Sequence, residues 1–233
     1  GNVIGTHYWG GGVYSVSGTL LIQDSTFSGN IADDGGALMS YGNSTTIVGS
    51  TFFGNTARFS GGAIYGNGGS RRIDIRQSTF SGNTADGAGA IYSNNATFLI
   101  ESSTIVGNSA TGSGGISSSG GASSVWLRNT IVAGNTDSGQ SIDAGNQFYS
   151  LGNNLIGRAA ASFGGTNGVN GDLLGTVASP IDPLLGPLAN NGGRTLTHKP
   201  LPGSPAIDAG AIVEGQSLEQ RGTARSVDGN SDG

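Results

Sequence analysis

The carboxylate side chains are the first groups whose spacing could support catalysis, because a glycoside hydrolase needs two of them facing each other across a groove. They are scattered along the chain, at Asp24, Asp33, Asp34, Asp74, Asp86 and Glu101. No spacing in the sequence brings two of them opposite each other. Asp74, Arg76 and Glu101 instead predict an outward polar patch on a strand-rich face, of the kind that solvent usually covers.

Basic residues and histidines give no stronger catalytic signal. A polysaccharide lyase would need a base, often Arg or Lys, beside bound calcium. Arginines are available at Arg71, Arg72, Arg76 and Arg128, but no acidic cluster accompanies them. His7 and His198 are the only histidines, lie near opposite ends of the chain and suggest no Ser-His-Asp triad. Without cysteine, a transition-metal site is not expected either. These residue types and spacings favour a non-catalytic protein over an enzyme.

The last six residues carry the best metal signal. Asp228-Gly229-Asn230-Ser231-Asp232-Gly233 matches the first half of a D-x-[DN]-x-[DN]-G calcium loop. Asp228, Asn230 and Asp232 would supply the ligands, but no distal bidentate carboxylate follows them, and such runs are also common in turns. Calcium is therefore a candidate ligand, and no cofactor is required.

Tyrosines recur at one place in the sequence and could form a contact surface. Tyr14, Tyr65 and Tyr92 each follow a glycine-rich phrase and an aliphatic residue, while Met39 or Ser40 interrupts the series. Stacked tyrosines on an outer face could bind glycans. They could equally stabilise that face or contact another subunit, and both alternatives remain open.

Tandem repetition indicates which elements position these side chains. The phrase S-T-F-S-G-N occurs at residues 25–30 and 78–83, with variants at 50–55, 103–108 and 129–135. A second phrase, G-G-A-[IL] or a close variant, follows each of the first four asparagines. The final asparagines of the five phrases are Asn30, Asn55, Asn83, Asn108 and Asn135.

An alternation of apolar residues precedes each phrase and predicts a strand with one buried face. Its two inward slots hold Leu20 and Ile22, Thr45 and Ile47, Ile73 and Ile75, and Phe98 and Ile100. In the fifth repeat the phrase is one residue longer. We expect Val125 and Leu127 to take the inward slots there, with a bulge near Ile131.

One repeat of this length cannot bury its own apolar face, whereas stacked repeats can. The sequence therefore predicts an all-β, right-handed parallel β-helix of about five or more coils with an irregular C-terminal extension. We expect Phe27, Phe52, Phe80 and Ile105 to form an interior column. The five asparagines are interpreted as a structural ladder, because stacked asparagine amides can hydrogen-bond to one another.

Two family resemblances follow from these phrases. The tandem G-G-A-[ILV] and F-x-x-N motifs, over residues 10 to 139, resemble the chlamydial polymorphic outer membrane protein repeat of the pectate-lyase-like β-helix superfamily. The later segment is similar to the tail of choice-of-anchor Q bacterial surface proteins. The residues that carry this resemblance are Asp182-Pro183-Leu184-Leu185-Gly186, Asn190-Asn191-Gly192-Gly193-Arg194, Ser204-Pro205-Ala206-Ile207-Asp208 and Gln220-Arg221-Gly222. That second resemblance implies export to the surface and a chain that continues beyond Gly233 to a sorting segment.

The composition of the chain limits the classes of partner that we expect it to bind. Charged residues make up 11% of the chain, the net charge is −5 and Lys199 is the only lysine, so nucleic acid is not expected as a partner. No apolar stretch approaches the roughly 18 residues that a spanning helix needs. We expect a β-helix domain over residues 1–157, and coils or a cap continuing the solenoid over residues 158–233.

The combined prediction is a secreted or cell-surface protein with a non-catalytic structural or adhesive role. It could assemble into fibres by self-association, and its other partners would be glycans or host and matrix surfaces. The alternative is a carbohydrate-binding or polysaccharide-cleaving β-helix protein.

Overall fold

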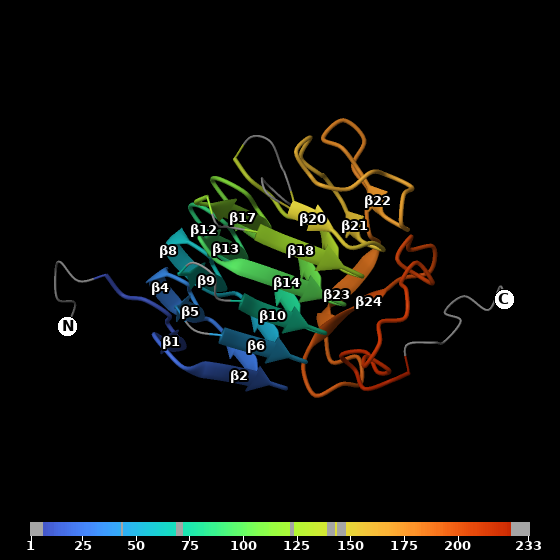
Figure 1. The fold of residues 1–233 in the computed structure, drawn as a ribbon. Helices are drawn as coiled ribbons and strands as arrows, with labels where there is room; N and C mark the ends of the chain where they lie inside the picture. Colours follow the sequence, from blue (N-terminus) through green and yellow to red (C-terminus); the bar gives the residue numbers. More distant parts are fainter. Residues whose placement is uncertain are drawn as a thin grey trace.

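The computed structural model describes residues 7–42, 44–68, 72–121, 124–138, 143 and 148–224. Within these residues the regular elements are strands and no helix is present. Parallel strands stack into a β-solenoid of about five turns, with a short antiparallel sheet near the C-terminus. Figure 1 shows the coils rising in order from β1 and β2 to β20 and β22. The predicted fold class is confirmed.

Four parallel sheets form the sides of the solenoid. The first contains β1 (Val13–Ser15), β5 (Leu38–Tyr41), β9 (Ile64–Asn67), β13 (Ile91–Asn94) and β17 (Ile116–Ser119). The second contains β2 (Thr19–Gln23), β6 (Ser44–Val48), β10 (Arg72–Arg76), β14 (Thr97–Glu101), β18 (Ser124–Arg128) and β20 (Phe148–Ser150). The third contains β3 (Thr26–Ser28), β7 (Thr51–Phe53), β11 (Thr79–Ser81), β15 (Thr104–Val106), β19 (Ile131–Ala133), β21 (Leu155–Ile156) and β22 (Leu173–Leu174). The fourth contains β4 (Ile31–Asp34), β8 (Thr56–Ser60), β12 (Thr84–Ala85) and β16 (Ser109–Ala110).

The core consists of columns in which equivalent residues of successive coils lie above one another. Ile47, Ile75 and Ile100 are in register across the second sheet and fully buried. In the third sheet, Phe52 stacks on Phe80 with ring centroids 4.9 Å apart and planes 5° from parallel. That separation matches the spacing of neighbouring strands, so the rings follow the backbone without adjustment.

The fifth coil corrects one expectation. Ile131 pairs directly with Thr104 and Val132 with Ile105, so β19 continues the ladder in regular register without the bulge we expected near Ile131. Val132 therefore occupies the inward slot. Val125 and Leu127 are both fully buried in the preceding strand, as predicted.

Glycine is required at the corner before the first sheet. A Cβ on Gly36, Gly62 or Gly89 would lie only 2.1 Å from a glycine carbonyl oxygen of the next coil. Any larger residue would push neighbouring coils apart. This close approach explains why the G-G-A phrase recurs once per coil.

The chain beyond the last coil leaves the solenoid axis. Leu173 and Leu174 extend the third sheet as β22, and the backbone N–H of Ile181 still donates to Gly157. Residues 182–224, here called the C-terminal arm, then run back along one side of the stack, in orange and red in Figure 1. The arm contains the antiparallel pair β23 (Leu185–Ala189) and β24 (Thr197–Pro200). It lies against the third sheet and its preceding turns.

Candidate functional site

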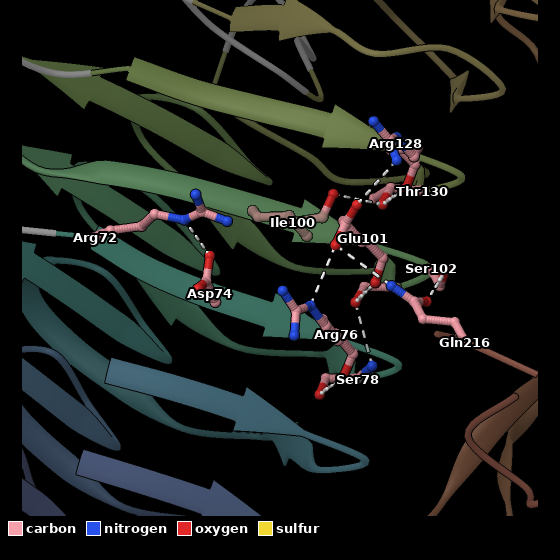
Figure 2. Close-up of polar contacts among 11 residues, drawn as sticks. Arg72, Asp74, Arg76, Ser78, Ile100, Glu101, Ser102, Arg128, Thr130 and Gln216 are labelled. Atoms are coloured by element: carbon pink, nitrogen blue, oxygen red, sulfur yellow. Dashed lines mark hydrogen bonds and ion pairs between the residues drawn. The ribbon is translucent and has the colours of Figure 1, made fainter. Parts of the chain in front are cut away.

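The outward polar patch of the second sheet is centred on Glu101, shown in Figure 2. Arg76 Nε donates to Glu101 Oε2 at 3.2 Å, and Arg128 Nη1 lies 3.6 Å from Oε1. Gln216 of the C-terminal arm also donates to Oε2, at 3.3 Å. Glu101 is consequently only 5% exposed. The residues predicted to form an open polar face do meet, but the arm covers the carboxylate.

Other carboxylates are also bound within the fold. Asp74 accepts a hydrogen bond from Arg72 at 2.5 Å, and Asp24 accepts one from Arg194 of the arm at 2.9 Å. Asp33 accepts from the backbone of Tyr8. Asp34 accepts from the backbone of Ser60, and burial raises the pKa of Asp34. Each of these four carboxylates faces a donor of the protein, so the arrangement resembles structural pairing rather than an acid–base pair. Arg71 lies outside the described residues.

The five predicted asparagines lie above one another at one corner of the solenoid. Each of the first four donates an Nδ2 hydrogen to Oδ1 of the asparagine in the next coil, at 2.8–2.9 Å, and its backbone N–H to the same oxygen at 2.9–3.1 Å. Asn55, Asn83, Asn108 and Asn135 are fully buried. Their amides hold adjacent coils together and are not available to a ligand.

The ladder ends on an aspartate that the sequence did not reveal. Asn135 donates to Asp143 Oδ1 from Nδ2 at 2.9 Å and from its backbone at 2.7 Å. The backbone of Arg158 donates to Oδ2. Asp143 is fully buried, and this burial raises its pKa to about 6. Asp143 belongs to no repeated phrase, so no spacing could identify it.

A second polar ladder precedes the third sheet. The backbone N–H of each serine donates at 3.2 Å to the hydroxyl oxygen of the serine in the next coil. These bonds run from Ser25 to Ser50, from Ser50 to Ser78 and from Ser78 to Ser103. Asn154 then accepts from the backbone of Thr130 and donates to Asp172 Oδ1. This ladder also ends on a carboxylate. The serines were visible in the repeated S-T-F phrase, but their hydrogen bonding was not anticipated.

The tyrosines line the outward face of the first sheet. Met39 fills the gap between Tyr14 and Tyr65. The rings of Tyr65 and Tyr92 lie 5.3 Å apart, and Tyr65 accepts a hydrogen bond from Asn94 at 2.8 Å. Tyr14 is 43% exposed. Three further aromatic side chains near this end of the solenoid are between 45% and 50% exposed, namely Tyr8, Trp9 and Tyr41.

The structure describes both candidate histidines but not the candidate calcium ligands. His198 lies on β24 of the arm and contacts the third sheet, where burial lowers its pKa and Ser81 Oγ is 2.9 Å from its Nε2. His7 lies near Asp33 and the ring of Phe59. Asp228, Asn230 and Asp232 lie outside the described residues. In the part of the chain that the structure covers, no three His, Cys, Asp or Glu side chains form a metal-binding group.

A search for membrane spans among the described residues finds no helix with the length and apolarity to cross a bilayer. Comparison with known proteins finds no matching family model, no matching curated protein and no matching solved structure. The described residues form a parallel β-solenoid with paired polar groups and with exposed aromatic side chains on the first sheet.

Proposed function

We propose that this chain is a non-catalytic adhesive or structural protein of the cell surface or extracellular space. The observation that carries the proposal is the exposed aromatic face of the first sheet, where Tyr14 and Tyr41 are each more than 40% exposed and the exposed ring of Trp9 lies beside Tyr14. Aromatic side chains combine a large apolar area with a polar group, and they are enriched where proteins contact partners. Glycans and host or matrix surfaces are the partners that we propose for this face.

The polar groups of the rest of the solenoid support a scaffold rather than a reaction centre. The ladder asparagines bond to one another and Glu101 is bound by two arginines. Among the described residues, no buried side-chain nitrogen or oxygen lacks a partner. A reaction centre usually keeps polar groups poised for substrate, whereas these groups stabilise adjacent coils.

Export and surface attachment form the second part of the proposal. The parallel solenoid suits the choice-of-anchor Q assignment and its polymorphic outer membrane protein-like repeats, which would place the chain at a bacterial surface. Calcium binding at Asp228, Asn230 and Asp232 would be an accessory property. Both assignments rest on the sequence motifs.

Fibre formation is better supported through lateral contacts than through end-to-end stacking. The fourth sheet ends at β16, the first at β17, the second at β20 and the third at β22, so the upper end of the solenoid tapers. The lower end exposes β1, β2 and β3, whereas Tyr8, Trp9 and Gly10 pair with the end of β4. These two edges do not match, which disfavours head-to-tail pairing of copies.

Binding assays with a matched set of variants test the adhesive role. Immobilised mucin, collagen and polygalacturonate would be probed with the wild-type chain and with a Tyr14→Ala, Tyr65→Ala, Tyr92→Ala variant. A Leu21→Ala, Ile31→Ala variant is the control, because these exposed apolar residues lie on other faces. We expect the tyrosine variant alone to lose binding. Release of new sugar ends from polygalacturonate by monodisperse protein would contradict a non-catalytic role, and equal binding by both variants would exclude the tyrosine face.

A further inference from the structure

The C-terminal arm and the third sheet enclose a cavity of about 230 Å³. Its floor is one outward column of side chains, formed by Thr79, Thr104, Ile131, Leu155 and Leu173. His198 of β24 lines the cavity as well, together with Glu219 and Arg221. We infer that this cavity is a binding site for a single neutral sugar ring.

The walls of the cavity are held in place without a ligand. Asn129 donates to the carbonyl of Ala211 at 2.7 Å and accepts from its backbone N–H at 3.0 Å. Asn153 donates to the carbonyl of Ala209 at 3.0 Å. On the other side, His198 contacts Ser81 and the carbonyl of Gly186. A preformed cavity costs little ordering on binding, which favours a small ligand that makes few contacts.

Size limits the ligand. Pockets that enclose drug-sized molecules usually measure about 300–1,000 Å³. The cavity beneath the arm is smaller, so it suits a ligand of about one ring rather than a folded partner or an aromatic cofactor.

Charge limits the ligand further. Arg221 Nε donates to Glu219 Oε1 at 2.5 Å, so the one cation and the one carboxylate of the lining form a pair. Burial lowers the pKa of His198, which keeps the imidazole neutral at neutral pH. The lining thus has no net charge, and a neutral ligand avoids burying an unpaired ion.

The remaining hydrogen-bonding capacity matches a polyol. Among the described residues, the hydroxyl of Thr104 and the terminal Nη atoms of Arg221 have no hydrogen-bond partner, although both residues line the cavity. Ile131, Leu155 and Leu173 supply an apolar surface beside them. A pyranose presents C–H groups on its faces and hydroxyls at its edge, so it can contact the aliphatic floor and bond to Thr104 and Arg221 together.

This site does not depend on the proposed adhesive role, because it lies under the arm and shares no residue with the tyrosine face. Glucose, galactose and N-acetylglucosamine are suitable probes, and inorganic phosphate tests for anion binding instead. Titration of the full chain would follow the methyl resonances of Ile131, Leu155 and Leu173 by NMR. For so small a ligand we expect saturable shifts with a millimolar dissociation constant.

Two pairs of variants localise the site. Thr104→Phe fills the floor, and Thr26→Phe places the same ring in the same outward column but outside the cavity. Arg221→Ala removes the guanidinium whose Nη atoms have no partner among the described residues. Arg72→Ala is its control, since Arg72 pairs with Asp74 through the same Nε geometry at 2.5 Å. We expect Thr104→Phe to weaken sugar binding more than tenfold and Arg221→Ala more than threefold, with both controls unchanged.

Three results would overturn the inference. These are the absence of saturable shifts with every sugar, displacement of the sugar by phosphate, and equal effects of the cavity and control variants. If Thr104→Phe fails to fold, the comparison of sugar binding by Arg221→Ala and Arg72→Ala still tests whether the sugar binds in this cavity. Loss of mucin or collagen binding in the tyrosine variant, with sugar binding intact, would separate the two proposals.

Discussion

The hydrogen bonds between neighbouring asparagines of the ladder all run in one direction, from each asparagine to Oδ1 of the asparagine in the next coil. An asparagine at the last position would have amide hydrogens with no further acceptor above it. Asp143 accepts from Asn135 and carries no such hydrogens, so it ends the ladder without leaving a donor unpaired. Asp172 ends the serine ladder in the same way. Each ladder ends on an aspartate because the last position has to accept hydrogen bonds and has no acceptor above it for hydrogens of its own.

Removal of an inner ladder asparagine should be costly. Asn83→Ala leaves two hydrogens of Asn55 and the carbonyl of Phe52 without their partner, and it removes one of the two donors to Oδ1 of Asn108. We expect a loss of about 2–4 kcal/mol in the free energy of unfolding, measured by chemical denaturation. Asn30→Ala is the matched control, because only its Nδ2 bond is lost at the open end, and it should cost about 1 kcal/mol. Equal losses would contradict the role of the ladder.

Asp143 should impose a pH dependence on stability. Its pKa is about 6 in the folded protein because burial disfavours the charged form, and about 3.8 when unfolded. The folded protein therefore binds more protons between these values. Stability should fall as pH rises from 4 to 6, by up to about 3 kcal/mol, and then level off. Denaturation curves of Asp143→Asn over the same range should lack this component. An identical pH profile in that variant would refute the assignment.

At the scale of elements, the sequence predicts the strands far better than the arm. The inward columns repeat once per coil, so Ile75 or Phe80 could be placed from periodicity alone. The bulge expected near Ile131 is absent because Ile131 pairs with Thr104 and Val132 with Ile105, so the extra residue of the phrase at residues 129–135 lies before the strand. The arm contacts use hydroxyls and amides at separations of 56 to 170 residues, such as Asn153 with Ala209 and Gln220 with Ser50. Such contacts leave no period in the sequence.

The phenylalanine column should contribute most to the core of the third sheet. Phe80 is fully buried between Phe52 and Ile105. Phe80→Ala should lower the free energy of unfolding by about 3–5 kcal/mol because it leaves a cavity between fixed coils. Phe59→Ala is the control, since Phe59 is 37% exposed, and should cost less than about 1 kcal/mol. Thermal or urea unfolding measures both. Similar losses would show that the column is not the main core contact.

At the scale of the whole molecule, the solenoid and its arm are held together in different ways. Each coil contacts the coils directly above and below it, as in other repeat proteins, and such stacks can unfold from one end. The arm instead touches many coils, from Asp24 near the bottom through Arg194 to Asn153 near the top through Ala209. It also contacts Glu101 through Gln216 in between. The arm therefore couples coils that do not touch one another.

This coupling predicts that the arm makes unfolding cooperative. Gln220 accepts from Thr79 at 2.7 Å and donates to Thr195 at 3.0 Å, so it joins two parts of the arm to the third coil. In a Gln220→Ala, Asn129→Ala variant the arm should detach under milder denaturant than the coils, because its remaining contacts are mainly isolated polar pairs. Amides protected in the wild type would then fall into two groups by hydrogen exchange, with lower protection at β24 and the arm than at β14. The matched control, Asn67→Ala, changes a half-buried amide of the first sheet away from the arm and should retain a single transition. One sharp transition with uniform loss of protection in the double variant would mean that the stacked coils alone set cooperativity. Separate transitions in the wild type would mean that the arm never coupled them.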